Sequence, residues 1–484
     1  MRYPGRAIFI GTALIYLALL PPGIPDVDAN SMFALADSLA DHGGFDVPCS
    51  LGVRGRGNDC YSHWYPLLSI AAVPFVLLGE LIAGVAGLPE AAVERAIALI
   101  VPALAAAGAA YFTAMLARRF SSTWKQATLA AVAFAFTTEA IVYARSFFAE
   151  TLVALLLAAG VWGVISDPSE RGKRVMGPVM LALAILAKPQ TVVAVGLLGI
   201  ALGFKDRRLA SFAPIASAAA GLGIYAAYNW VRFADPFLFR GQTPGELNPL
   251  HAPIGFSLLL VSPGRGIFIF SPIAIAGCIA LYRMRRTRVG VASITACSGL
   301  LLTYAMLTGR GADWGDRYLL PALPFLCASL VVLRGRTARL AVTLGLIGAL
   351  IQIPATASFW QRYYLEQLAR GVTADELSWS ITRTPLIGAW GAMSRQLSDA
   401  SETDVSEVIE QSGESTADVE ESGLMRTVAQ WWWFLPAVGV SRWLGAAASV
   451  AAIAAGIALL ISVWRRGSGA DIGRIRFDSL PNGT

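Results

Sequence analysis

Residues 66–88 read PLLSIAAVPFVLLGELIAGVAGL, with Glu80 as the single charged side chain. A transmembrane helix needs about 20 consecutive, mostly apolar residues, so this stretch is long enough to cross a bilayer. Similar runs recur along the whole chain of 484 residues, of which 56% are hydrophobic and only 14% are charged. Soluble proteins carry about 25% charged residues. The sequence therefore predicts an all-α polytopic membrane protein and excludes a water-soluble enzyme.

The net charge of +6 comes from Lys and Arg residues that stand largely in short segments between apolar runs. This distribution is typical of membrane orientation, because cytoplasmic loops are rich in Lys and Arg. We therefore expect no nucleic-acid partner. The sequence also lacks a phosphate-binding G-x-x-x-x-G-K-[ST] loop and paired C-x-x-C motifs, which argues against an ATPase and a zinc module.

The placement of 66–88 decides the topology. If it crosses the membrane, Arg118, Arg119 and Lys125 fall on the outer side. If it instead lies along the outer interface, as an amphipathic or re-entrant segment, every later basic cluster faces the cytoplasm. We therefore place 66–88 at the outer interface. The clusters that decide this lie at 118–125, 171–174, 205–208, 283–288, 334–339 and 465–466.

This placement leaves about twelve membrane spans and both termini in the cytoplasm. The first span, about residues 7–20, is expected to stay in the protein rather than to be cleaved as a signal peptide. Residues 1–357 then form a transmembrane catalytic module with an external loop at 21–92. Residues 358–442 form a second external loop, and 443–484 form the last span and a cytoplasmic tail. Within 358–442, the acidic segment 399–422 lacks Lys and Arg and is expected to be flexible.

The ionisable residues gather outside the spans. A channel or carrier needs such groups near the middle of the bilayer, but the middles of the predicted spans are almost entirely apolar. All three histidines and many Asp and Arg residues fall in the predicted external segments. This distribution favours an enzyme that works at the outer interface over a transporter.

Candidate carboxylates follow the first and third spans. Asp26 and Asp28 stand in PDVD, where Asp28 could cap a helix over about 29–42. Two carboxylates at the membrane surface also suit a general base or a metal-assisted site. Arg145 and Glu150 stand in YARSFFAE. They either pair with each other, or place Glu150 near the two aspartates and Arg145 near a phosphate.

Candidate binding residues stand in four further external stretches. His63 and Tyr65, in CYSHWYP, either bind an anionic headgroup or belong to an aromatic interface belt. Lys188 either extends its ammonium group toward water or faces the same cavity as Glu150 and the two aspartates. In SPGRGIFIFSP the glycines let backbone N–H groups approach a phosphate and Arg265 supplies charge. Arg317, in WGDRYLL, stands one turn above a span.

The five cysteines divide by position. Cys49 and Cys60 share the external loop 21–92, and exported segments favour disulfides, so this pair predicts a disulfide bond. Cys278, Cys297 and Cys327 stand in predicted spans and are expected to be core residues.

The order of these motifs resembles the GT-C superfamily of membrane glycosyltransferases, in the branch of the protein mannosyltransferases and aminoarabinose transferases. The resemblance covers about residues 1–357. It implies a GT-C-like fold with interfacial helices in the first external loop. It also implies an enzyme that moves a hexose or pentose, with inversion, from a polyprenyl-phosphate carrier to an acceptor hydroxyl. The reaction would take place on the outer face of the plasma membrane.

The resemblance also suggests roles. Asp28 matches the family's general base, with Asp26 as the alternative, and Glu150 matches a second acidic residue. Arg265 and Arg317 match residues that would hold the carrier phosphate. His63 stands where relatives often carry lysine, and the large soluble C-terminal domain of many relatives is missing.

The sequence requires no cofactor, although the oxygens of Asp26, Asp28 and Glu150 also suit a divalent metal. The acceptor is left open as a lipid, a glycan or a protein. Alternative functions are a ligase that transfers a whole lipid-linked glycan, a flippase, and an accessory membrane protein.

Overall fold

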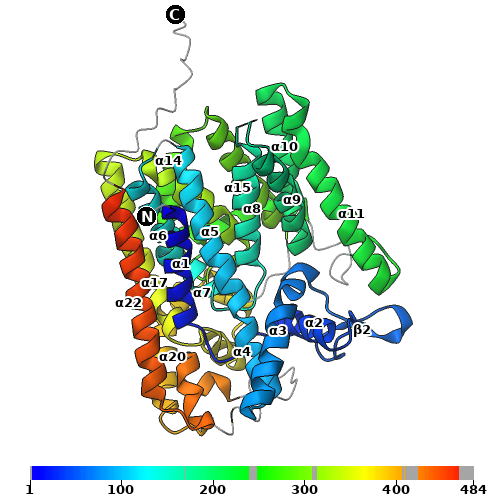
Figure 1. Cartoon of the computed structure of the whole chain (residues 1–484), viewed down its shortest axis with the longest axis vertical. Coiled ribbons are helices and arrows are strands. Elements are labelled where there is room, and N and C mark those ends of the chain that lie inside the picture. Colours follow the sequence, from blue (N-terminus) through cyan, green and yellow to red (C-terminus); the bar gives the residue numbers. More distant parts are fainter. Residues whose placement is uncertain are drawn as a thin grey trace, which may run out of the picture.

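Helices build almost all of the computed structural model, which describes residues 3–120, 122–167, 169–238, 248–307, 313–405, 408 and 423–467. Within these residues the only sheet is a two-stranded antiparallel pair, in which Val53 lies opposite Tyr61 (Figure 1). The predicted all-α class is therefore confirmed. Most of the acidic segment 399–422 and the tail from residue 468 lie outside the described residues.

The N-terminal half begins with α1 (Pro4–Ala18), a helix of the bundle, and continues into the long loop that follows α1. Its elements are α1 (Pro4–Ala18), α2 (Val27–Asp41), β1 (Val53–Arg54), η1 (Arg56–Asn58), β2 (Cys60–Tyr61), α3 (Pro66–Ala86), α4 (Glu90–Ala98), α5 (Ile100–Arg119), α6 (Trp124–Thr137), α7 (Ala140–Tyr143), α8 (Glu150–Val164), α9 (Arg171–Ala187), η2 (Pro189–Thr191), α10 (Val192–Asp206), η3 (Leu209–Phe212) and α11 (Ala213–Phe233).

The C-terminal half completes the bundle and adds several short helices. Its elements are η6 (Pro249–His251), α12 (Ala252–Val261), α13 (Ile267–Phe270), α14 (Ile273–Arg283), α15 (Arg288–Ala305), η7 (Arg317–Ala322), α16 (Leu323–Ser329), η8 (Leu330–Val332), α17 (Gly335–Ala357), α18 (Gln361–Ala369), α19 (Ala374–Trp379), α20 (Pro385–Asp399), η9 (Leu424–Arg426), η10 (Trp431–Val438) and α22 (Arg442–Arg466).

Six helices among the described residues are long and apolar enough to cross a membrane, and five shorter apolar helices accompany them. The count of about twelve spans stays a prediction. Helix α3 is one of the six, so its placement along the outer interface also stays a prediction. It exposes an apolar face with Leu77, Leu81 and Val85, as expected of a helix that contacts lipid.

The basic clusters meet at one end of the bundle. Arg119 contacts Glu170 at 3.4 Å, and Lys125 lies over the ring of Trp464 at 4.4 Å. Arg288 contacts Asp206 at 2.8 Å. This end is the upper one in Figure 1, where α1 begins and α22 ends. The arrangement agrees with one basic face; that this face is cytoplasmic stays a prediction.

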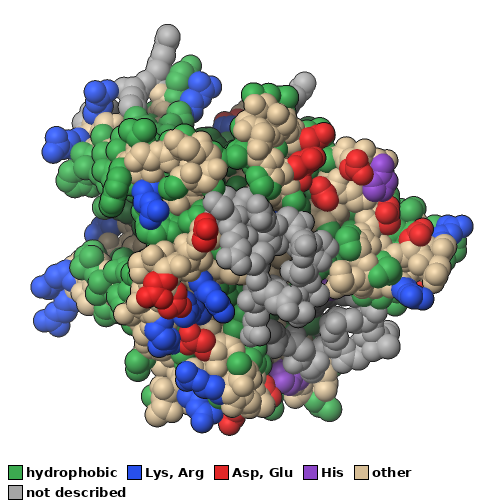
Figure 2. All heavy atoms as spheres, turned by 90° about the horizontal axis from the view of Figure 1, so that it is seen from below, with side chains coloured by type: hydrophobic (Ala, Val, Ile, Leu, Met, Phe, Trp, Pro, Cys, Tyr) green, Lys and Arg blue, Asp and Glu red, His purple; other side chains and the backbone are tan. Residues whose placement is uncertain are grey.

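The opposite, lower end of the molecule carries both acidic and basic side chains, as Figure 2 shows. The loop that follows α1 contains the bonded pair Cys49–Cys60, which confirms the predicted disulfide. Helix α11 holds this loop, because the buried Arg232 donates to the carbonyl of Ser62 and, at 2.7 Å, to Oδ1 of Asn229.

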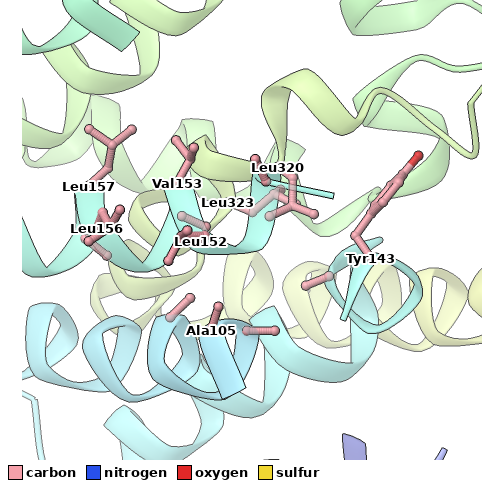
Figure 3. Close-up of a cluster of buried hydrophobic side chains, with 14 of the residues drawn as sticks. Ala105, Tyr143, Leu152, Val153, Leu156, Leu157, Leu320 and Leu323 are labelled. Carbon is pink, nitrogen blue, oxygen red and sulfur yellow. The ribbon is translucent and has the colours of Figure 1, made fainter. Parts of the chain in front are cut away.

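The centre of the bundle is made of close contacts between small and branched residues. Helix α8 contributes four branched side chains to this centre, Leu152, Val153, Leu156 and Leu157 (Figure 3). They lie near Ala105 of α5, Leu320 of η7 and Leu323 of α16. Small residues on α5 let the two backbones approach, as is usual in membrane bundles. The packing fixes η7, and η7 carries Arg317.

Helices α1 and α22 cross at two glycines. A Cβ at Gly11 would lie 2.9 Å from the carbonyl oxygen of Gly456, and a Cβ at Gly456 would lie 2.5 Å from that of Gly11. Both are backbone atoms and cannot move aside, so even one methyl group must separate the helices.

We therefore expect Gly456→Ala to lower the free energy of unfolding by about 1–3 kcal/mol, the usual cost of overpacking. Thermal unfolding of the purified protein in detergent measures the change. Gly223→Ala is the matched control, since a Cβ there meets no atom within 4 Å. Equal unfolding midpoints for the two variants would contradict the proposed crossing.

Candidate functional site

A cluster of ion pairs around Arg317 joins segments that are far apart in the sequence. Nη2 of Arg317 lies 3.0 Å from Oδ2 of Asp28. Nε of Arg317 lies 3.6 Å from Oε1 of Glu150 and 3.3 Å from Oδ1 of Asp313. The guanidinium, Glu150 and Asp313 are buried, whereas the side chain of Asp28 is 39% exposed. A molecule that approaches from outside therefore meets Asp28 first.

Lys188 extends the cluster from the end of α9. Its Nζ lies 2.5 Å from Oε1 of Glu150 and 4.4 Å from the ring centre of Tyr318. Buried charges are costly unless they are paired, so Glu150, between Lys188 and Arg317, holds two cations close together. Arg and Lys side chains make strong charge-assisted hydrogen bonds to phosphates, so two neighbouring cations suit an anionic group.

Asp26 lies beside this cluster. Its Oδ2 accepts a hydrogen bond of 2.8 Å from Nε2 of Gln361 in α18. Its side chain is partly accessible, but loss of solvent around the carboxylate raises the pKa of Asp26 to about 7. The opposing effects of Gln361 and Arg317 are smaller. Asp26 therefore changes its charge near neutral pH.

The capping role expected of Asp28 is wrong. Helix α2 begins at Val27, so Asp28 lies in its first turn, and the N-cap residue is Asp26. No side-chain hydrogen bond caps the start of α2, so neither Asp26 nor Asp28 caps this helix. A carboxylate in the first turn is still favoured by the helix dipole, which leaves Asp28 pointing at Arg317.

Arg265 is part of the cluster, but it is enclosed. Its Nη2 lies 3.5 Å from Oδ2 of Asp313 and its Nε lies 3.4 Å from Oδ2 of Asp316. The neighbouring glycine does not face a phosphate: the N–H of Gly264 donates to the carbonyl of Ser378 at 3.0 Å. Arg265 therefore holds the segment 313–317 in place rather than presenting a free cation.

Arg145 does not pair with Glu150. Its guanidinium donates to the backbone carbonyls of Leu19, Ala355 and Ala429, the middle one at 3.2 Å. Leu19 follows the last residue of α1, Ala355 lies in the last turn of α17, and Ala429 stands just before η10. We therefore leave Arg145 out of the proposed site, because its donors tie three parts of the chain together.

His63 and Tyr65 lie at the edge of the site. The ring of His63 lies 4.7 Å from that of Trp64. The hydroxyl of the buried Tyr65 accepts a hydrogen bond from Nε2 of Gln190, two residues after Lys188. The structure thus brings Tyr65 close to the segment that carries Lys188.

Sequence reasoning missed four residues of the site. For Asp313 and Asp316, the available signal is their position just before Arg317 in DWGDR. Gln361 carries no such signal. Glu139 is fully buried, and its carboxylate faces Gly315, where a Cβ would lie 2.2 Å from Oε2.

Two nitrogens of Arg317, Nε and Nη1, make no hydrogen bond to the described residues, although Nε lies within ion-pair distance of Glu150 and Asp313. Nη1 has no such ion pair. Buried polar groups without partners are rare in folded proteins, so Nη1 is the donor of this guanidinium that still needs an acceptor.

The arrangement does not suit a metal held by Asp26, Asp28 and Glu150. Asp28 and Glu150 face cations and Asp26 faces an amide donor. In the part of the chain that the structure describes, no group of three or more His, Cys, Asp or Glu residues converges on one point. We derive no step through a metal.

Comparison with known proteins finds no matching family model and no matching curated protein. Among solved structures, ArnT from Cupriavidus metallidurans bound to undecaprenyl phosphate aligns with a TM-score of 0.49 and 14% identity, over 97% of this chain and 78% of that one. The oligosaccharyltransferase AglB from Archaeoglobus fulgidus, in complex with an inhibitory peptide and a dolichol-phosphate, aligns with a TM-score of 0.42 and 13% identity, over 78% of this chain and 56% of that one.

Both alignments have sequence identities well below 25%. Their TM-scores lie below 0.5, so no activity is carried over from them to this chain.

We expect Lys188→Met to lower the free energy of unfolding by about 3 kcal/mol, because it leaves the buried Glu150 with Arg317 alone. The double variant Lys188→Met/Glu150→Gln removes the uncompensated charge and should regain part of that loss. Unfolding in detergent of these two variants and of the single variant Glu150→Gln measures the coupling between the two residues. Strictly additive losses would show that the pair is not coupled.

Proposed function

We propose that this chain is a membrane glycosyltransferase. It moves a monosaccharide from a polyprenyl-phosphate carrier to an acceptor hydroxyl on the outer face of the plasma membrane. The observation that carries the proposal is the buried pair of cations, Arg317 and Lys188, held by Glu150 beside an accessible carboxylate, Asp28.

The cations have a direct use in this reaction. When the bond between the sugar and the carrier breaks, negative charge grows on the phosphate. Donors fixed in a site of low dielectric constant stabilise such charge strongly. Nη1 of Arg317, which has no partner among the described residues, supports a role as the phosphate donor. Lys188 supplies the second positive charge.

Asp28 is the proposed general base. Its Oδ2 is held by Arg317, and its Oδ1 makes no hydrogen bond to the described residues. Oδ1 takes the proton of the acceptor hydroxyl while the acceptor oxygen bonds to the anomeric carbon of the sugar. The bond from that carbon to the phosphate oxygen breaks, and the polyprenyl phosphate leaves. A single displacement of this kind inverts the anomeric centre.

Two observations support the outer face. The Cys49–Cys60 disulfide lies in the loop that leads from Asp28 to Tyr65, and disulfides persist in oxidising compartments. The basic clusters gather at the other end of the bundle, which the distribution of Lys and Arg in membrane proteins assigns to the cytoplasm.

We expect Asp28→Asn to lower the transfer rate by about 10²–10⁴-fold, the usual contribution of a general base. The assay follows radiolabelled sugar from a panel of polyprenyl-phosphate donors into a membrane acceptor fraction. Asp59→Asn, an exposed aspartate of the same loop, is the matched control and should keep the wild-type rate. Transfer by Asp28→Asn at the control rate would remove Asp28 from the mechanism.

The pH dependence separates Asp28 from Asp26. Because the pKa of Asp26 is about 7, this residue is neutral at lower pH and no longer repels a phosphate near Arg317. We therefore expect the KM for the carrier to fall about two- to tenfold from pH 8 to pH 6. Asp26→Asn should keep the low-pH KM throughout.

The opposite result has a clear meaning. If kcat, rather than KM, falls tenfold per pH unit below pH 7, a base is being protonated. If Asp26→Asn is then inactive, Asp26 is the general base and Asp28 serves to hold Arg317.

A further inference from the structure

Two separate apolar cavities lie beside α1. The first, of about 570 Å³, is lined by α1, α3, α5 and α8, with Phe9, Phe75 and Leu152 among its residues. The second, of about 640 Å³, lies between the end of α1, the α3–α4 turn, α4 and η10. Ala96 and Trp431 line the second cavity. Both volumes are in the range of ligand sites.

The two cavities approach the site from different sides. Leu152 follows Glu150 by two residues on α8, a rise of about 3 Å, so the end of the first cavity at Leu152 lies near the start of α8, where Glu150 contacts Lys188 and Arg317. Pro22, in the wall of the second cavity, precedes Asp26 by four residues. Four residues span about 14 Å at most, so the wall of the second cavity at Pro22 lies within about that distance of Asp26.

Buried hydrogen bonds hold the wall of the second cavity. The N–H of Trp431 donates to the carbonyl of Leu20 at 2.9 Å. Arg145 donates to the carbonyls of Leu19 and Ala429, just before these two residues. The buried cation that the transfer mechanism does not use therefore fixes η10 against the end of α1 and keeps the cavity open.

We propose that the second cavity binds the hydrocarbon tail of the acceptor, so that the acceptor is a membrane lipid with a hydroxyl-bearing headgroup. This inference rests on the proposed function. The carrier has one tail, and its phosphate must meet Arg317 and Lys188, which assigns that tail to the first cavity. The second substrate must bring its hydroxyl to Asp28. A tail in the second cavity anchors it there, because apolar walls favour an apolar occupant.

Photo-crosslinking tests the cavity without requiring transfer. The full-length protein is placed in vesicles of phosphatidylethanolamine and phosphatidylglycerol with a phosphatidylethanolamine that carries a diazirine in its acyl chain. We expect labelled peptides from α4 and η10, loss of that labelling in Ala96→Trp, and wild-type labelling in Ala451→Trp on the exposed face of α22. Ala92→Leu, a smaller filler of the same wall, replaces Ala96→Trp if that variant does not fold.

Competition identifies the occupant. Excess undecaprenyl phosphate should displace the probe from α3 and α8 but leave the labelling of α4 and η10 unchanged. Displacement from α4 and η10 would assign the second cavity to the carrier and overturn the proposal. Labelling of α4 and η10 no stronger than that of the lipid-exposed face of α17 would also overturn it.

The chemical nature of the product gives an independent test. After transfer from radiolabelled donors to a crude membrane fraction, mild acid removes unused carrier-linked sugar, and the products are partitioned. We expect acid-stable label in the organic phase and a raised acceptor KM for Ala96→Trp with an unchanged carrier KM. Label confined to protein or water-soluble glycan would overturn the lipid acceptor. No label in any fraction would count against the proposed function, while crosslinking still decides what the cavity binds.

Discussion

The buried guanidinium of Arg317 is the interaction on which the outer part of this molecule depends. It meets Asp28 from α2, Glu150 from α8 and Asp313 from its own loop. Each of these groups would be costly to bury alone. The loop after α1, the start of α8 and the segment before η7 are therefore held together by one ion cluster, and the packing of η7 against α8 fixes its position.

The same cluster explains how many charged side chains can be buried at the end of an otherwise apolar bundle. Four carboxylates (Asp28, Glu150, Asp313 and Asp316) face three cations (Lys188, Arg265 and Arg317). Arg265 is enclosed by two aspartates, whereas Nη1 of Arg317 has no hydrogen-bond partner among the described residues. Because the pKa of Asp26 is about 7, the negative charge beside this cluster changes with pH around neutrality.

Several features were predictable because they depend on short segments. The membrane class follows from hydropathy, and the Cys49–Cys60 bond follows from two cysteines in one external loop. The stretches that carry Asp28, Glu150, Lys188 and Arg317 were recognisable because charged residues beside apolar runs need partners. Predictions about the local use of a side chain fared worse. Asp28 does not cap α2, and Gly264 serves close packing against Ser378 rather than phosphate binding.

The sequence by itself determined the membrane class of this protein and the short stretches in which its candidate site residues stand, because hydropathy and the distribution of charge are properties of each segment alone. Only the tertiary structure decided which charges meet. Arg145 and Glu150 are five residues apart, yet Arg145 binds three backbone carbonyls and Glu150 binds Lys188. The distance between two buried ions is set by how helices far apart in the sequence pack, and the energy of such a pair depends on that distance and on burial.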